Sequence, residues 1–262
     1  MIGEMKREAL QSLNGKWGLS VGSTILYFIL NYILSFVASF IILIPGIFLM
    51  AIIGSSISSF EEETATVGAV MAIIVIYGLM FIVNLASYGI MTYGYMNLSL
   101  RLSKRDGAVI DCLFEGFRGF KRMLKAIKAM LAICLYTGTW IPLILISMFV
   151  FLFGEGSDSA NESLGIAFFV LLFISFIVIV IASLSYAMTY YILVENPEYG
   201  VLQALRESKA MMKGHKMDLF LLGLSFIGWA VLAIFTFGIG FLWLYPYFNT
   251  TIAHFYQYVS EK

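Results

Sequence analysis

The sequence predicts an all-α, polytopic membrane protein, with six transmembrane helices in three hairpins and amphipathic helices beside the membrane. Three observations predict this class. Hydrophobic residues make up 61% of the chain and charged residues 12%, against about 45–50% and about 25% in soluble globular domains. The apolar residues gather in runs long enough for a bilayer, which a helix crosses with about 20 residues. The basic residues fall in alternate loops.

The whole chain, residues 1–262, is expected to form a single integral membrane domain, because no polar segment is long enough to fold alone. The longest polar segment, residues 101–128, has only 28 residues. Residues 1–17 are mostly polar and precede the first apolar run, so we expect a cytoplasmic, amphipathic N-terminal segment and no cleaved signal peptide. The two cysteines fit neither a disulfide framework nor a zinc site.

The apolar runs predict six spans, which lie at about 19–44, 67–94, 129–153, 164–194, 219–235 and 241–259. The first run is too long for one straight span. We expect Pro45-Gly46 to break it and to leave residues 47–53 at the interface or dipping back into the bilayer. Pro142 in the third run predicts a kink, since neighbouring helices satisfy the carbonyl group that a proline frees.

The last apolar run, residues 219–259, is ambiguous. Its first part is a marginal span, and Gly238 and Gly240 then allow a tight turn. The sixth span has the right length, but it carries several polar residues: Asn249, Thr250, Thr251 and His254. It suits lipid only if it packs against other helices. Six spans are favoured over five.

Basic residues mark one side of the membrane. Fifteen of the sixteen Lys and Arg residues lie in the N-terminal tail, in the loop after the second span and in the loop after the fourth. The other two loops hold six carboxylates and no base. Because short cytoplasmic loops are enriched in Lys and Arg, we expect the N-terminus in the cytoplasm, and with six spans the C-terminus as well.

Residues 195–218 predict a polar helix between two long apolar runs. Asn196 is placed to cap its start, Pro197 suits the first helical position, and Gly214 suits a left-handed stop. One face is largely apolar and consists of Val201, Leu205, Ser208 and Met212. This pattern is typical of a helix that lies on a membrane surface.

Several motifs resemble one bacterial integral membrane family. They are Glu195-Asn196-Pro197, Ala204-Leu205-Arg206-Glu207-Ser208, Met212-Lys213-Gly214-His215-Lys216, the stretch from Gly238 to Tyr247, His254-Phe255-Tyr256, Ile44-Pro45-Gly46-Ile47 and the stretch from Gly116 to Lys121. The sequence is similar to domain of unknown function 975 over nearly its whole length. It departs from the family where an acidic insert, and no Pro-Gly turn, joins the third and fourth spans. The resemblance implies a multi-span protein of the bacterial cell membrane and no particular reaction.

No catalytic chemistry is predicted. The expected spans contain no Lys, Arg, Asp or Glu, which argues against a proton-coupled carrier or an intramembrane acid–base enzyme. Paired carboxylates, a nucleophile with a histidine partner and a glycine-rich phosphate loop are absent from the sequence. We expect a protein that is not an enzyme and that needs no cofactor or metal. His254 is the one ionisable residue of the doubtful sixth span, where a packed, hydrogen-bonded histidine is the simplest interpretation.

The basic loops are candidate contacts for anionic lipid or for a membrane protein partner. The residues concerned are Lys121, Arg122, Lys125, Lys128, Arg206, Lys209, Lys213 and Lys216. Each base near the surface attracts anionic lipid by about 1 kcal/mol. The simpler alternative is that these bases only set the topology. Nucleic-acid binding is not expected, because the bases are confined to the plane of the membrane.

A second set of residues is a candidate polar cleft that opens to the cytoplasm. It consists of Tyr93, Asn97, Tyr190, Asn249 and His254. The alternative is an aromatic belt at the headgroups, with the amides acting between helices. The favoured function is a non-enzymatic accessory, assembly or regulatory factor of the bacterial cell membrane. The alternative is an uncoupled transporter or exporter of small molecules or lipids, and a membrane enzyme with an unfamiliar site is a weaker third.

Overall fold

The computed structural model describes residues 1–57, 62–138, 141, 144–145, 148–149 and 158–261. Every element in these ranges is a helix. The elements are α1 (Ile2–Leu13), α2 (Trp17–Ile57), α3 (Glu62–Lys104), η1 (Ile110–Phe117), α4 (Phe120–Gly138), α6 (Asp158–Tyr186), α7 (Thr189–Glu195), α8 (Val201–Met211), α9 (Lys216–Leu224), α10 (Ile227–Phe235) and α11 (Phe241–Ser260).

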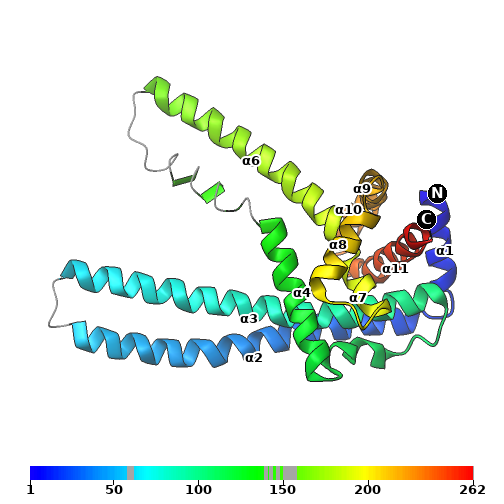
Figure 1. The fold of residues 1–262 in the computed structure, drawn as a ribbon, viewed down its shortest axis with the longest axis horizontal. Coiled ribbons are helices and arrows are strands. Elements are labelled where there is room, and N and C mark those ends of the chain that lie inside the picture. The colour runs from blue at the N-terminus through cyan, green and yellow to red at the C-terminus, as the bar shows by residue number, and fades with distance from the viewer. Residues whose placement is uncertain (58–61, 139–140, 142–143, 146–147, 150–157, 262) are drawn as a thin grey trace.

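Two arms leave a compact head (Figure 1). The first arm is the hairpin of α2 and α3, and the second arm consists of α4 and α6. The head consists of α1, η1 and α7 to α11, together with the adjoining ends of the arm helices. Both chain termini lie in the head. The described parts of both arms therefore start from one body of helices.

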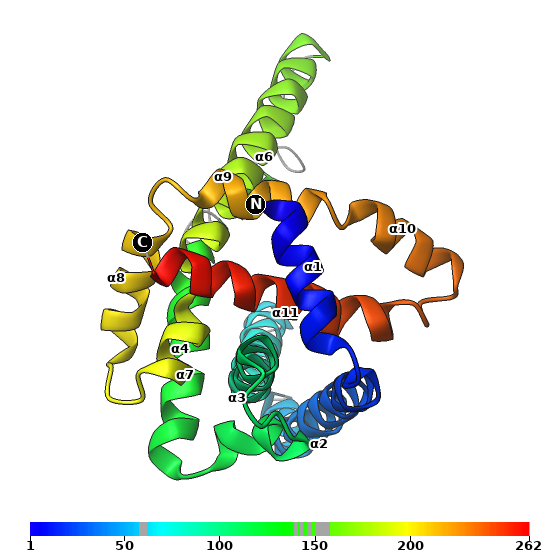
Figure 2. The same ribbon diagram turned by 90° about the vertical axis from the view of Figure 1, so that its right-hand side faces the viewer.

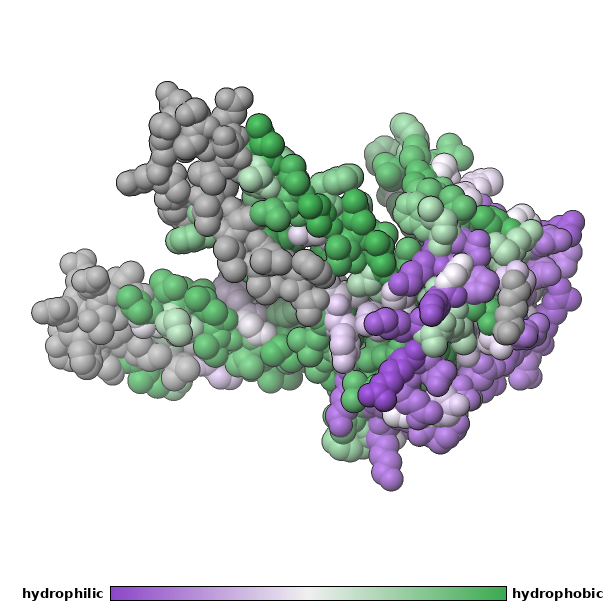
Figure 3. Space-filling view, turned by 45° about the horizontal axis from the view of Figure 1, so that its top comes forward, coloured by the Kyte–Doolittle hydropathy of each residue, from purple (hydrophilic) through white to green (hydrophobic). Residues whose placement is uncertain are grey.

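The surface of α3 changes character near its middle. Most of its large apolar side chains between residues 67 and 88 are exposed, with Ile74 at 59% and Tyr77 at 68%. From Gly89 to Leu100 all but one residue is buried. The exposed part has 22 residues, close to the number of about 20 that a bilayer requires. Figure 3 shows the apolar side chains over the arms and the polar ones gathered on the head.

Within the part of the chain that the structure describes, four segments are long and apolar enough to cross a membrane, by length and composition: Trp17–Ile52, Val70–Lys104, Gly165–Glu195 and Lys216–Phe235. An all-helical protein with several candidate spans is thus confirmed. The count of six in three hairpins stays a prediction. The expected third span begins in α4 and runs over residues outside the described part, as does Pro142. The expected sixth span is helical, as α11, but does not fall among the four segments.

The predicted break at Pro45-Gly46 is wrong. Helix α2 is continuous from Trp17 to Ile57 with Pro45 inside it. Gly46 packs directly on α3, since a Cβ placed on it would lie 2.9 Å from Cδ1 of Ile76. This close contact favours a helix that continues through the proline, as packed membrane helices permit. Residues 47–53 therefore extend the helix and do not dip back.

Glycines let helices approach α3 closely at the base of the first arm. A Cβ on Gly89 would lie 2.8 Å from Cβ of Met130 in α4. A Cβ on Gly94 would overlap the carbonyl oxygen of Leu113 in η1. These two positions bring α4 and η1 onto α3. They mark the level at which the arm enters the core of the head.

The predicted start of the helix at residues 195–218 is also wrong. Helix α8 begins at Val201 with Gly200 as its N-cap, and Asn196 instead ends α7. The Nδ2 of Asn196 donates to the carbonyl oxygen of Ile192 at 3.2 Å. Asn196 is non-helical because the ring of Pro197 disfavours helical geometry in the preceding residue. Gly214 has the expected left-handed conformation, with φ of +92°, but α8 already ends at Met211.

The apolar face of α8 is buried, but against protein. Ala204, Ser208 and Met212 are fully inaccessible and Leu205 nearly so. The Oγ of Ser208 donates to the carbonyl oxygen of Ser185 at the end of α6, at 2.9 Å. The amphipathic pattern therefore attaches α8 to the head, and this face is not available to lipid.

Candidate functional site

Three lysines of α4 line a groove between α4 and α8. They are Lys121, Lys125 and Lys128, whose spacing of four and three residues places them on one side of the helix. The groove has a volume of about 460 Å³. Its other lining residues are Leu124 on α4 and Gly200, Val201, Leu202 and Gln203 at the start of α8.

The charges of this groove are largely uncompensated. Lys125 donates to the carbonyl oxygen of Pro197, which holds α4 beside the start of α8. Neither Lys121 nor Lys128 forms an ion pair with a carboxylate in the described part of the chain. Leu202 is 58% exposed beside them. The groove thus combines ammonium groups with accessible aliphatic surface.

The structure divides the eight predicted basic contacts. Arg122 does not line the groove, because it pairs with Glu115 of η1, which also binds Arg118. Arg206, Lys209 and Lys213 lie on the exposed side of α8 and its following turn, outside the groove. Lys216 lines a separate cavity of about 390 Å³ between α6 and α9.

The residues of the predicted polar cleft lie at contacts between helices. The hydroxyl of Tyr93 donates to the carbonyl oxygen of Leu193 at 3.2 Å, and that of Tyr190 to the carbonyl oxygen of Ala126 at 3.0 Å. Asn97 is buried and accepts from Nε of Arg101 at 3.3 Å. The amide of Asn249 donates to the carbonyl oxygen of Tyr245 within α11, at 2.8 Å. In this structure these polar groups join α3, α4 and α7, or stay within one helix.

His254 connects α11 with the N-terminal helix. Its Nε2 lies 3.1 Å from Oγ of Ser12, and its Nδ1 lies 3.6 Å from a carboxylate oxygen of Glu8. Burial lowers the pKa of His254, because it disfavours the imidazolium. The carboxylate of Glu8 opposes this effect and the guanidinium of Arg105 adds to it. The neutral imidazole therefore fits this contact best.

Two further clusters of contacting side chains were not predicted from the sequence. The rings of Tyr27, Tyr95 and Tyr245 meet at centroid distances of 4.9, 5.0 and 5.8 Å and join α2, α3 and α11. Glu195 pairs with Lys104 and accepts a 2.5 Å hydrogen bond from the hydroxyl of Tyr256. The signal for the second cluster was present, because Glu195 and Tyr256 both belong to motifs that carry the family resemblance.

Within the described residues, no group of three or more His, Cys, Asp or Glu side chains could hold a metal ion.

A family model described as "Protein of unknown function (DUF975)" matches residues 1–262, the whole chain. The chain belongs to this family. No curated protein and no solved structure matches it. The contact between Glu195 and Tyr256 therefore joins two motifs of a DUF975 protein, while the groove between α4 and α8 is its most strongly basic cavity among those described above.

Proposed function

We propose that this DUF975 protein is a non-enzymatic accessory, assembly or regulatory factor of the bacterial cell membrane that binds anionic lipid headgroups. The groove between α4 and α8 carries the proposal, because three lysines line it and none of them has a carboxylate partner among the described residues. Lys121, Lys125 and Lys128 would hold the phosphate of a lipid. The exposed side chain of Leu202 would lie against its first methylene groups.

The charge distribution supports a head on the cytoplasmic side. Fifteen of the sixteen bases of the sequence lie in α1 and the turn after it, between the end of α3 and α4, or from α8 to the start of α9. All these segments belong to the head or adjoin it (Figures 1 and 2). Bases that accumulate in cytoplasmic loops would meet the anionic lipids of the inner leaflet there. Both termini would then be cytoplasmic.

The proposal is tested by titrating the purified full-length protein in neutral detergent with phosphatidylglycerol and counting bound lipids by native mass spectrometry. The triple variant Lys121→Gln, Lys125→Gln, Lys128→Gln is expected to weaken the first binding event by about 100-fold, at about 1 kcal/mol for each base. The matched control is Arg206→Gln, Lys209→Gln, Lys213→Gln, which removes the same charge outside the groove. Equal losses in both variants would refute a specific site.

The transporter alternative makes a different prediction. It requires a continuous polar path, whereas the hydroxyls of Tyr93 and Tyr190 end on backbone carbonyls of neighbouring helices. Proteoliposomes that hold a fluorescent lipid in one leaflet separate the two functions. Under the accessory function, lipid exchange between leaflets is no faster than in protein-free vesicles. Exchange that depends on the amount of protein would favour the transporter.

A further inference from the structure

The last third of the chain contains the two doubtful spans, and its helices are short. Helices α9 and α10 have nine residues each, or about 13 Å, against a hydrocarbon thickness of about 30 Å. Ser225 and Phe226 separate the two helices, because α9 ends before them and α10 begins after them. In Figure 2, which looks along the first arm from the head, α2 and α3 are seen end-on and run away from the viewer, while α9 and α10 run across the picture. The two short helices thus lie across the base of the arm and not alongside it.

A lysine of α1 contacts the middle of the segment Lys216–Phe235, and this contact argues against a membrane crossing by that segment. The Nζ of Lys6 donates to the carbonyl oxygen of Ser225 at 2.8 Å and lies 4.1 Å from the ring centre of Phe226. Ser225 is the tenth of the twenty residues, so a crossing would place this ammonium near the centre of the bilayer. A charge there costs about 2.5–3.5 kcal/mol even on the mildest scales. Helix α1, which carries this lysine and other charged residues, would then also have to enter the bilayer.

Helix α11 runs beside the buried part of α3, not beside its exposed part. The ring of Tyr245 near the start of α11 lies 5.0 Å from that of Tyr95, and Tyr256 near the end of α11 contacts Glu195, the partner of Lys104. Tyr95 and Lys104 are nine residues apart, which is about 13 Å along a helix. The interval that α11 covers along the arm is therefore less than half of a bilayer.

The turn between α10 and α11 presents apolar side chains to the surroundings. Phe235 is 78% exposed, Phe237 99% and Ile239 59%. Phe237 has a φ of 53°, a left-handed conformation that is a genuine outlier for a bulky residue. Figure 3 shows this region as a second apolar area, separate from the arms. In water such a tip would be unfavourable, since it leaves three large side chains without burial.

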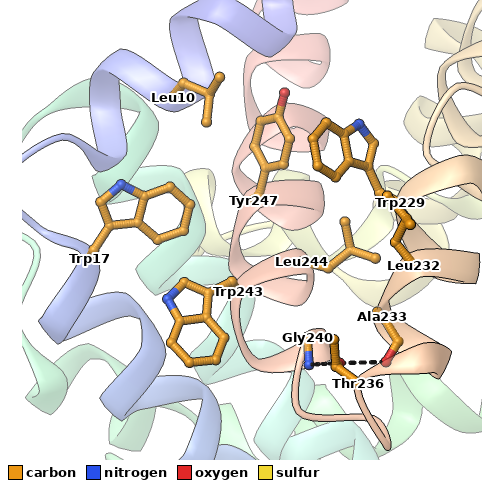
Figure 4. A pocket seen from close by; sticks show the side chains of 10 residues that line it. All are labelled: Leu10, Trp17, Trp229, Leu232, Ala233, Thr236, Gly240, Trp243, Leu244 and Tyr247. Atoms are coloured by element: carbon orange, nitrogen blue, oxygen red, sulfur yellow. Dashed lines mark hydrogen bonds between the residues drawn. The ribbon is translucent and has the colours of Figure 1, made fainter.

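Beside this tip lies a cavity of about 350 Å³ (Figure 4). Three of the four tryptophans of the chain line it: Trp17 at the start of α2, Trp229 on α10 and Trp243 on α11. The other lining residues are Leu10, Leu232, Ala233, Thr236, Gly240, Leu244 and Tyr247, and none of the ten is charged. Tryptophan is enriched where the headgroups meet the hydrocarbon. Phe28 of α2, 5.2 Å from Tyr245, places the start of α11 at the level where the arm becomes exposed.

We propose that α9, α10 and α11 do not cross the bilayer and that the α10–α11 hairpin lies in the leaflet next to the head. The partner is membrane lipid: Phe235, Phe237 and Ile239 insert among the acyl chains, and one chain enters the tryptophan cavity. The bilayer is then crossed by the two arms alone. This inference does not depend on the lysine groove, which lies on the α4–α8 side of the head.

Single cysteines test the proposal in the full-length protein, with Cys112→Ala and Cys134→Ala as the background. A membrane-impermeant maleimide is applied to sealed vesicles of either orientation that contain Ile239→Cys or the reference Ser260→Cys. Because Ile239 is placed among the acyl chains, the tip is expected to label more slowly than Ser260→Cys and, where it labels, from the same side. Labelling from the opposite side would overturn the proposal, because it requires α9–α10 and α11 to cross.

If the tip labels from neither side, the depth of Trp243 in the bilayer distinguishes an interfacial hairpin from a crossing one. With Trp17→Phe, Trp140→Phe and Trp229→Phe, Trp243 is the remaining tryptophan, and its fluorescence is quenched by lipids brominated at known positions of the chain. Stronger quenching by bromine near the headgroup supports an interfacial hairpin. Stronger quenching by bromine near the chain end overturns it. Binding of phosphatidylglycerol in the groove is measured separately, so either proposal can fail without the other.

Discussion

The exposed part of α3 and the helix α11 look alike as predicted spans, yet the structure uses them in opposite ways. Between residues 67 and 88, α3 exposes large apolar side chains such as Tyr77. In α11 the polar Asn249, Thr250 and Thr251 are buried together with Phe255. The first surface suits lipid and the second suits protein. Length and apolar content therefore do not decide what surrounds a helix, whereas the direction of its polar side chains does.

The largest expected effect comes from truncating the same residue type on each of these two helices. Phe255→Ala removes a fully buried ring from α11, and about 3–5 kcal/mol of stability should be lost. Phe81→Ala removes a ring that is 60% exposed on α3, and only a small change in protein stability is expected. Thermal unfolding in detergent measures both. Equal losses would break the distinction between a lipid-facing and a protein-facing helix.

Adding one methyl group tests the same boundary along α3 itself. Gly94→Ala would drive a Cβ into the carbonyl oxygen of Leu113, and about 1–3 kcal/mol should be lost as η1 is pushed away. Gly78→Ala, on the exposed part, meets no atom within 4 Å and should stabilise the helix by about 0.5–1 kcal/mol. Unfolding midpoints measure the two changes in stability, which should have opposite signs. A loss at Gly78 similar to that at Gly94 would show that the arm is also tightly packed.

A smaller effect is expected at the contact that holds α1 on the last helices. Lys6→Met removes a cation from the C-terminal end of α9 and from the ring of Phe226, and about 1 kcal/mol should be lost. Burial lowers the pKa of Lys6, so part of the interaction is offset by desolvation. Arg7→Met, on the exposed side of α1, is the matched control. Limited proteolysis near Asn14 should become faster in the first variant only.

The helical class and the first arm could be predicted from the sequence because they depend on composition and periodicity. The predicted second span, residues 67–94, stays a prediction, and the change from exposed to buried residues falls within it, at Gly89. The break at Pro45 was mispredicted because packing at Gly46 outweighed the local signal. The start of α8 was mispredicted because Pro197 keeps Asn196 out of the helix. The groove was found in part, since spacing places Lys121, Lys125 and Lys128 together. The tryptophan cavity unites three distant segments, which periodicity does not bring together.

The smallest expected effect is a pH dependence of protein stability that arises at His254. It distinguishes α11, which carries this histidine, from the uncharged part of α3. Its folded pKa lies below its ordinary value because burial disfavours the imidazolium, so the unfolded chain binds the proton more readily. This contribution to stability is complete above the unfolded pKa of about 6.5 and is lost as the pH falls below it. Glu8 moderates the loss and Arg105 increases it. Unfolding midpoints between neutral and mildly acidic pH should therefore fall less for His254→Gln than for the unmodified protein. An unchanged slope in His254→Gln would mean that α1 and α11 stay associated without regard to this proton.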